Sequence, residues 1–152
     1  MEVRHIVDPN GRPAPYRLYL PPDYTPARPW PVILFLHGAG ERGRDNERQL
    51  AVGLAPALRA HPERWPAIVV FPQAPEDALW MGDAAAAALA ALEATRAECA
   101  VDPQRILLTG LSMGGHRSWY LAYRRPELFA AVVPVCGWVS RIGLSRDAAE
   151  SP

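Results

Sequence analysis

The sequence predicts an α/β fold: a mostly parallel sheet with helices on both faces and an antiparallel hairpin at its N-terminal edge. Short apolar runs, typical of strands that are covered on both faces, alternate with longer helix-forming stretches. Such alternation indicates right-handed strand–helix–strand crossovers, which make neighbouring strands parallel. The length of 152 residues is enough for one domain with a single hydrophobic core and too short for two such domains.

The hairpin is indicated by two short alternating runs near the N-terminus, residues 3–6 and 16–20. Asp8, Asn10 and Gly11 lie between them and have the composition of a turn. We therefore expect two antiparallel strands before the parallel part of the sheet begins.

Four apolar runs predict the remaining strands, and three stretches between or beside them predict helices. The second helix is expected to begin at Asp83 as its N-cap, because this residue precedes five consecutive alanines. The expected strands are residues 32–36, 67–71, 106–109 and 131–135, and the expected helices are residues 47–60, 83–99 and 113–124.

Ligands of open parallel sheets bind beyond the carboxyl ends of the strands. Chemistry is therefore expected in the four loops that follow Leu36, Phe71, Thr109 and Cys136.

Composition excludes several classes of function. Sixteen basic and sixteen acidic residues balance, so the chain lacks the positive charge that binds nucleic acid. All basic residues are arginines, which excludes the lysine chemistry of Schiff bases, pyridoxal phosphate and P-loops. No apolar run approaches the roughly 18 residues of a membrane span, and the first residues lack the apolar core of a signal peptide. We expect a cytoplasmic protein with no membrane partner.

The two cysteines, Cys99 and Cys136, lie in apolar stretches and do not form a C-x-x-C metal pair. We expect both to be buried thiols. Neither a metal nor a cofactor is expected.

A nucleophile is expected at Ser112, the centre of a G-x-S-x-G pattern between a predicted strand and a predicted helix. A strained turn there exposes the serine hydroxyl, and glycine at Gly110 and Gly114 avoids steric clashes with the neighbouring strand and helix. The following helix N-terminus supplies positive potential and a free backbone N–H at Met113 for the oxyanion of a tetrahedral intermediate.

The second oxyanion donor is expected in the loop after Leu36, where Gly38, Ala39 and Gly40 let the backbone approach a substrate oxygen closely. The N–H of Ala39 is the first choice.

The same loop matches the dinucleotide pattern G-x-G-x-x-G. That interpretation also needs the third glycine inside a helix and an acidic residue at the end of the next strand. Residues 44–46 still intervene before the predicted helix, and the next strand ends in Phe71-Pro72-Gln73. We therefore do not expect a dinucleotide cofactor.

Three stretches together resemble the α/β-hydrolase superfamily: residues 31–46, 71–75 and 101–137, the last with T-G-L-S-M-G-G at its centre. They are most similar to phospholipase/carboxylesterase-type and polyhydroxybutyrate-depolymerase-like esterases, some of which are described as predicted peptidases. The likeness extends over residues 16–138. It implies a Ser-His-Asp hydrolase of acyl esters in which Ser112 is the nucleophile and the N–H groups of Met113 and Ala39 form the oxyanion hole.

The sequence departs from this family in its triad, which runs in the order serine, acid, histidine. No histidine follows His116, so the chain offers no triad base, and Asp147 is the candidate acid. A serine hydroxyl without a base is a poor nucleophile. We expect the N-terminal part of a single hydrolase domain, truncated after its sixth strand and nearly inactive alone.

The four histidines have other expected roles. His37 is expected to be structural and to orient the oxyanion loop, and His116 to pack against the sheet on a helix that points away from the pocket. His5 and His61 are expected at the surface.

Pocket residues are expected around the nucleophile: His37 and Gly40, together with Trp80 and Trp138, which follow strand ends and could line an acyl or aromatic pocket or simply pack against the sheet. The helical spacing of Trp119, Tyr120 and Tyr123 predicts core positions.

The sequence thus predicts a serine hydrolase of carboxylesterase type that acts on a small-molecule acyl ester, with serine peptidase and thioesterase as alternatives. A different class also remains open: a catalytically inactive binding or assembly module of the same fold. Such a module would associate with itself through an open sheet edge, or receive a histidine from another chain.

Overall fold

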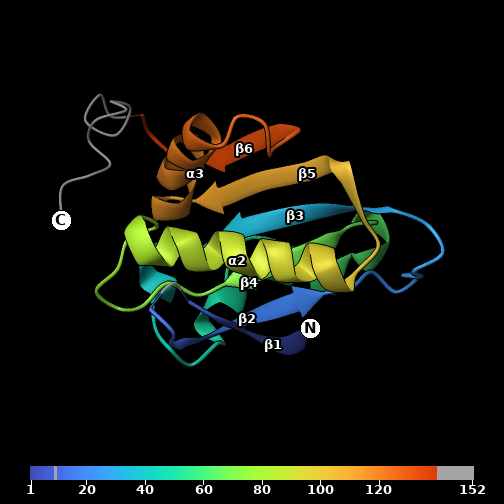
Figure 1. Cartoon of the computed structure of the whole chain (residues 1–152), viewed down its shortest axis with the longest axis horizontal. Helices are drawn as coiled ribbons and strands as arrows, with labels where there is room; N and C mark the ends of the chain where they lie inside the picture. Colours follow the sequence, from blue (N-terminus) through green and yellow to red (C-terminus); the bar gives the residue numbers. More distant parts are fainter. Residues whose placement is uncertain (9, 140–152) are drawn as a thin grey trace.

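A computed structural model describes residues 1–8 and 10–139 of the chain. In this part, six strands form one mixed sheet, with three α-helices and three short 3₁₀ helices around it (Figure 1). The strands are β1 (Glu2–Val7), β2 (Pro13–Tyr19), β3 (Trp30–Leu36), β4 (Ile68–Pro72), β5 (Val101–Leu111) and β6 (Ala131–Val135). The helices are α1 (Leu54–Ala60), α2 (Gly82–Glu98) and α3 (Met113–Arg124), and the 3₁₀ helices are Ala39–Glu41, Arg48–Leu50 and Pro62–Arg64.

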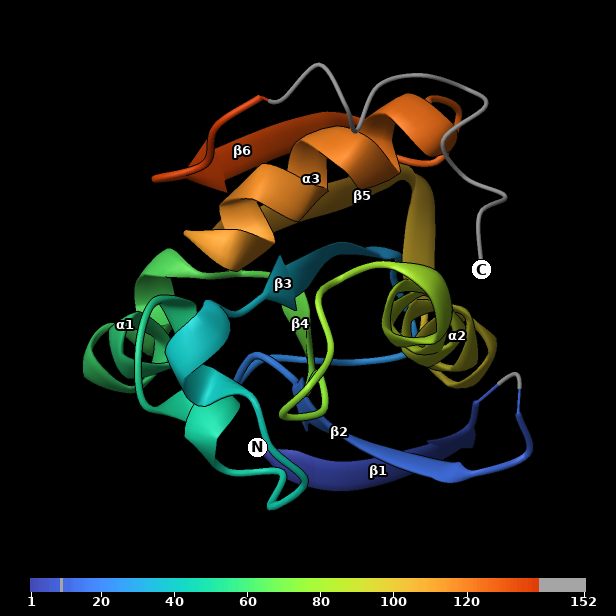
Figure 2. The same cartoon turned by 90° about the vertical axis from the view of Figure 1, so that its left-hand side faces the viewer.

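The sheet has the order β1-β2-β4-β3-β5-β6. β1 pairs antiparallel with β2, and β2 antiparallel with β4, whereas β4, β3, β5 and β6 run parallel to one another. Figure 2 shows α1 on one side of the sheet and α2 on the other. The predicted fold class is confirmed, including the antiparallel hairpin at the edge.

Two apolar cores lie on the two faces of the sheet. Along β3, Leu34 belongs to the core beneath α2 and α3, and the next residue, Phe35, belongs to the core beneath α1. This alternation follows from the two-residue period of a strand. All five residues of β4 are buried, which explains why its sequence is almost continuously apolar.

Helix α2 lies within one residue of its predicted bounds, but its expected start is wrong. The N-cap is Met81, which makes no side-chain capping bond. Asp83 lies in the first turn instead, and its carboxylate accepts a hydrogen bond from the side-chain amide of Asn10 in the β1–β2 turn. The Asp83 carboxylate therefore bonds to Asn10 of the hairpin instead of capping the N-terminus of α2.

The single helix expected over residues 47–60 is also wrong. The chain forms the 3₁₀ helix Arg48–Leu50 and then α1, with Gly53 between them at φ 69°. A Cβ at Gly53 would lie 2.6 Å from the Phe35 ring. The chain therefore passes close to Phe35 in a left-handed conformation that breaks the helix.

The aromatic residues of α3 do not follow the core prediction. Trp119 and Tyr123 are 42% and 43% exposed, and only Tyr120 packs partly against the core. The buried face of α3 carries three small residues, Gly114, Gly115 and Ser118, together with the core residues Met113 and Leu121. The small residues bring the helix close to β5 and leave the larger aromatic rings outside.

Of the two cysteines, Cys99 is half-buried and Cys136 is exposed, so the expectation of a buried thiol is wrong for Cys136. Cys136 follows the edge strand β6, where burial on both sides is lost. No helix within residues 1–8 and 10–139 is long and apolar enough to cross a bilayer.

Candidate active site

Ser112 lies at the turn between β5 and α3, as the sequence predicts. Its backbone has φ 53° and ψ −109°, a conformation that is uncommon for a residue other than glycine. The residue is exposed, and its own N–H donates to the carbonyl oxygen of Val135 at 2.8 Å. Strained backbone at an exposed polar residue is characteristic of functional sites.

The strained turn depends on close backbone contacts that only glycine permits. A Cβ at Gly110 would lie 2.5 Å from the carbonyl carbon of Gly114. A Cβ at Gly114 would lie 1.9 Å from the carbonyl oxygen of Leu36, the last residue of β3. The predicted steric reason for both glycines is thus observed.

The loop that follows β3, residues 37–46, is called the β3 loop below. It lies directly beside the Ser112 turn, because a Cβ at Gly38 would be 3.4 Å from the carbonyl oxygen of Leu111 and 3.7 Å from the Cβ of Ser112. Ala39 begins a 3₁₀ helix and Met113 begins α3, so neither N–H has a partner within its own helix. Ala39 thus follows the residue of the β3 loop that approaches Ser112, and Met113 follows Ser112 itself.

A carboxylate also lies at this point. The Oε2 atom of Glu41 is 3.0 Å from the position that a Gly38 Cβ would take. Sequence reasoning did not single out Glu41, although it belongs to the loop in which chemistry was expected.

His37 is fully buried, and both of its ring nitrogens are engaged. Nε2 accepts a hydrogen bond from the N–H of Ala74 at 2.9 Å, so the proton is on Nδ1, which donates to the carbonyl oxygen of Gly38 at 2.7 Å. Burial lowers the pKa of His37 to about 4, and the positive charge of Arg42 also lowers it. A neutral ring with no free nitrogen is a structural support of the β3 loop and not a base for Ser112.

Trp80 is 1% exposed and packs edge-on against His37, with 4.8 Å between the ring centroids. Its indole N–H donates to the carbonyl oxygen of His37 at 2.9 Å. His37 and Trp80 therefore form a buried unit that supports the loop. This agrees with the structural role expected of His37 and with the packing alternative for Trp80, and neither side chain is exposed to line a pocket. Gly40, by contrast, is exposed, with open space around the position of a Cβ.

Trp138 is 54% exposed and stacks on His116, with 4.5 Å between centroids and 10° between the ring planes. The Nδ1 atom of His116 hydrogen-bonds to the carbonyl oxygen of Trp138. His116 thus lies against the segment that follows β6, and the expectation that it packs against the sheet is wrong. The cause is Gly137, whose close approach to the first turn of α3 brings Trp138 over the histidine.

The other two histidines are exposed: His5 in β1, and His61 beyond α1, where Nδ1 lies 3.5 Å from Glu63. None of the hydrogen bonds observed within residues 1–8 and 10–139 joins Ser112 to a histidine side chain. Asp147, the candidate triad acid, lies outside the described residues.

The structure adds a second group that the sequence did not single out. Gln73, directly after β4, hydrogen-bonds to three places on the β3 loop. The available signal was positional, because β4 lies beside β3 in a parallel sheet and its carboxyl end meets the same rim.

Comparisons with known proteins agree with this fold. The model of the prolyl oligopeptidase family matches residues 78–149, and no curated protein matches the chain. A solved thermostable esterase is 38% identical, with a TM-score of 0.76 over 90% of this chain and 40% of that chain. An S-formylglutathione hydrolase from Staphylococcus aureus is 18% identical, with a TM-score of 0.70 over 90% of this chain and 57% of that one. A ferulic acid esterase is 22% identical, with a TM-score of 0.63 over 86% and 57%.

A mixed sheet with a strained serine between a parallel strand and a helix defines a protein of the α/β-hydrolase fold. The chain has the α/β-hydrolase fold and is similar to these solved hydrolases, and it spans between 40% and 57% of the length of the three.

Proposed function

We propose that the protein is a serine hydrolase of carboxylic esters in which Ser112 is the nucleophile. The observation that carries this proposal is the exposed Ser112 at φ 53°, directly beside the β3 loop. The 38% identity to a thermostable esterase supports esters as the substrate class. The match to the prolyl oligopeptidase family keeps peptide hydrolysis as one alternative. Thioester hydrolysis is the other, because the same acyl transfer to Ser112 would cleave a thioester.

In the proposed reaction, Oγ of Ser112 loses its proton to a base and attacks the ester carbonyl carbon. The carbonyl oxygen becomes an oxyanion that accepts hydrogen bonds from the N–H groups of Met113 and Ala39, while Gly38 leaves room for its approach. The alkoxide departs with a proton from the same base, and an acyl-enzyme remains. Water then attacks the acyl-enzyme to release the acid and restore Ser112.

The base and the acid of the triad come, in this proposal, from residues other than those placed beside Ser112. The ring nitrogens of His37 are both occupied, and Nδ1 of His116 is held by Trp138. We propose that residues 1–152 are the N-terminal part of a single α/β-hydrolase domain whose later strands carry the histidine and the acid. Asp147 remains a candidate for the acid.

The test is covalent labelling with a fluorophosphonate, which reacts with activated serine nucleophiles. In the intact protein we expect the label on the peptide that contains Ser112, together with turnover of p-nitrophenyl acetate. Both are expected to vanish in Ser112→Ala, with Ser140→Ala as the matched serine control. A label on another residue, or full turnover by Ser112→Ala, would contradict the assignment.

Residues 1–152 alone are expected to turn the ester over only at the residual level that oxyanion stabilisation provides, about 10³- to 10⁴-fold above water. Robust turnover by this chain that disappears in His116→Ala would show that His116 is a resident base and overturn the proposed origin of the triad.

A second candidate function is self-association, which the exposed edge of the sheet favours. Among the described residues β6 pairs only with β5, and its Val133 and Val135 are 55% and 45% exposed. These two side chains border an apolar groove of about 400 Å³ formed with β3, β5 and α1. An unpaired edge beside an apolar surface promotes association between copies.

Size-exclusion chromatography with light scattering tests this second candidate. We expect the mass of residues 1–152 to rise with concentration and to return to that of a monomer in Val133→Glu, whereas Val3→Glu in the edge strand β1 serves as the matched control. A mass that stays monomeric at every concentration would argue against association.

A further inference from the structure

The side chain of Gln73 connects the end of β4 to the β3 loop. It is half-buried, and its Oε1 atom accepts a hydrogen bond from the N–H of Asn46 at 2.6 Å. Its Nε2 atom donates to the carbonyl oxygen of Glu41 at 3.1 Å and to Oδ1 of Asp45 at 3.0 Å. One amide therefore fixes three points on the loop.

The next residue adds two backbone contacts to the same loop. The N–H of Ala74 donates to Nε2 of His37, and its carbonyl oxygen accepts from the N–H of Gly43, both at 2.9 Å. Gln73 and Ala74 together thus hold the β3 loop at five places between residues 37 and 46. The contacts of Gln73 come from its side chain, so substitution at position 73 removes them, whereas Ala74 contributes its backbone N–H and carbonyl oxygen.

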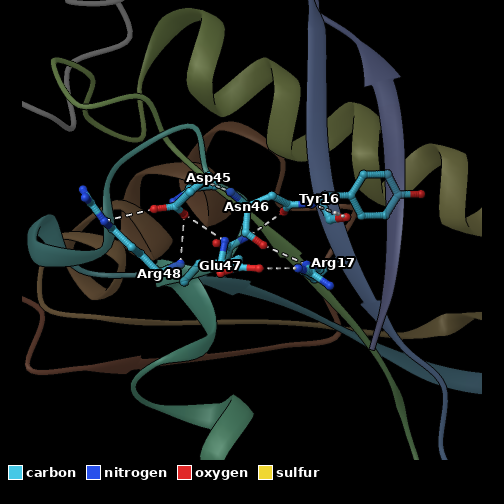
Figure 3. Close-up of polar contacts among 8 residues, drawn as sticks. Tyr16, Arg17, Asp45, Asn46, Glu47 and Arg48 are labelled. Carbon is cyan, nitrogen blue, oxygen red and sulfur yellow. Dashed lines mark hydrogen bonds and ion pairs between the residues drawn. The ribbon is translucent and has the colours of Figure 1, made fainter.

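Asp45 is itself fixed where it meets Gln73. Its carboxylate accepts hydrogen bonds from the N–H groups of Glu47 at 2.8 Å and Arg48 at 3.0 Å, and it pairs with the Arg48 guanidinium (Figure 3). The backbone bonds to Arg48 and Glu47, and then the bond to Gln73, lower the pKa of Asp45 to about 2. Asp45 is therefore a fixed anionic acceptor for the Gln73 amide.

The far end of the loop is anchored to the sheet. Asn46 has φ 55°, its side-chain amide donates to the Tyr16 carbonyl oxygen at 3.4 Å, and its own carbonyl oxygen accepts from Nε of Arg17 at 2.7 Å (Figure 3). Near the start of the loop, the Ala39 carbonyl oxygen accepts from Nε of Arg42 at 2.9 Å. Gln73 holds the 3₁₀ helix that begins with Ala39 through its bond to the carbonyl oxygen of Glu41, the last residue of that helix.

We propose that Gln73 is a positioning residue that fixes the β3 loop so that the Ala39 N–H is preorganised beside Ser112. The expected effect of Gln73 on catalysis rests on the proposed function, whereas its fixation of the β3 loop does not. Gln73 does not touch the reacting atoms and acts through Glu41 and Asp45. An amide is required because the site needs one acceptor and two donor bonds from the same planar group.

Gln73→Glu is the sharpest test, because the carboxylate keeps the shape and the Oε1 acceptor but loses both donor bonds and faces the Asp45 carboxylate. In the intact protein we expect amide hydrogen exchange over residues 38–46 to become about tenfold faster or more, while exchange in α2 stays unchanged. We expect kcat for p-nitrophenyl acetate to fall about 10- to 100-fold, with KM changed less than about threefold, since a misplaced donor weakens the transition state more than substrate binding.

The matched control is Gln104→Glu, the same chemical change at an exposed position in the N-terminal half of β5, away from the Ser112 end of that strand. It is expected to alter neither the exchange over residues 38–46 nor kcat. If Gln73→Glu does not fold, Gln73→Ser removes the same bonds without adding a charge and replaces it in the comparison.

The outcomes separate this inference from the proposed function. Unchanged exchange over residues 38–46 in Gln73→Glu, or faster exchange with an unchanged kcat, overturns the positioning role. If the wild-type protein neither hydrolyses esters nor takes the label at Ser112, the proposed function is wrong, and the exchange measurement still decides whether Gln73 fixes the loop.

Discussion

Replacing Gly114 with alanine is expected to destabilise the protein by about 4 kcal/mol or more. The new Cβ would lie 1.9 Å from the carbonyl oxygen of Leu36 and 2.8 Å from that of His37. Both contacts are with backbone, so no side-chain rotation relieves them, and the first turn of α3 must move away from the end of β3. Urea unfolding followed by circular dichroism measures the loss.

The direction of this effect is opposite to helix propensity. In a helix interior, alanine is more favourable than glycine by up to about 1 kcal/mol. Replacing an exposed glycine of α3 with alanine would therefore stabilise the protein. Gly40→Ala is the matched control, because a Cβ at Gly40 would have no atom within 4 Å, and we expect a change within about 0.5 kcal/mol. Equal stability of Gly114→Ala and wild type would show that α3 does not approach β3 as closely as the structure indicates.

The tight contact between α3 and β3 also explains why the strand–serine–helix element could be predicted so well. Gly110 and Gly114 are needed on both sides of Ser112 for a steric reason that is local in sequence, so the motif carries its own structure. The predicted bounds of the following helix, residues 113–124, agree with α3 as observed. Buried strands such as β4 were equally clear, because burial on both faces leaves a continuous apolar run.

The predictions that failed depend on contacts between distant parts of the chain. The helix expected over residues 47–60 breaks at Gly53 because the chain passes the ring of Phe35, which lies 18 residues earlier on β3. Asp83 does not cap α2 because Asn10 of the hairpin holds its carboxylate. Neither partner is visible in a local window of sequence.

In the candidate site, too, the features set by local sequence could be predicted and those set by distant contacts could not. The serine turn and the β3 loop were predictable from their motifs, but the fixation of that loop by Gln73 was not, since it requires knowing that β4 lies next to β3. The role of Trp80 was open for the same reason. A tryptophan after a strand end can line a pocket or fill a core, and its hydrogen bond to the His37 carbonyl oxygen decides for the core.

Acid is expected to weaken the protein between about pH 6.5 and 4 through His37, the second large effect that the structure implies. In the folded state burial holds the His37 pKa near 4, against 6.5 for the ordinary side chain. Between these values the unfolded chain binds a proton that the folded chain does not, so stability falls as the pH falls. Below about pH 4 both states are protonated and the loss from this group levels off.

The size of the loss is about 3 kcal/mol, a large part of the 5–15 kcal/mol that holds a typical domain together. Urea unfolding at a series of pH values measures it. His37→Gln is the comparison, because a glutamine amide can accept from the Ala74 N–H and donate to the Gly38 carbonyl oxygen without titrating. We expect this variant to be less stable near neutral pH, since a flexible amide fills the imidazole site poorly, but to lose much less stability on acidification.

Asp45 does not obscure this measurement, because its pKa moves in a different range. The carboxyl has an ordinary pKa of 3.8 and about 2 in the folded protein, so its contribution is complete above pH 3.8 and is lost only as the pH falls toward 2. A decline that begins near pH 6.5 and is absent in His37→Gln therefore belongs to the buried imidazole. The folded ring stays neutral down to about pH 4, so the hydrogen bond from the Ala74 N–H to Nε2 persists over this range. It is lost only when the folded ring takes up a proton below about pH 4, where hydrogen exchange over residues 38–46 is expected to rise. A wild-type unfolding free energy that stays constant from about pH 7 to 4 would show that His37 is not held neutral, and with it the assigned hydrogen bonds beneath the β3 loop would be wrong.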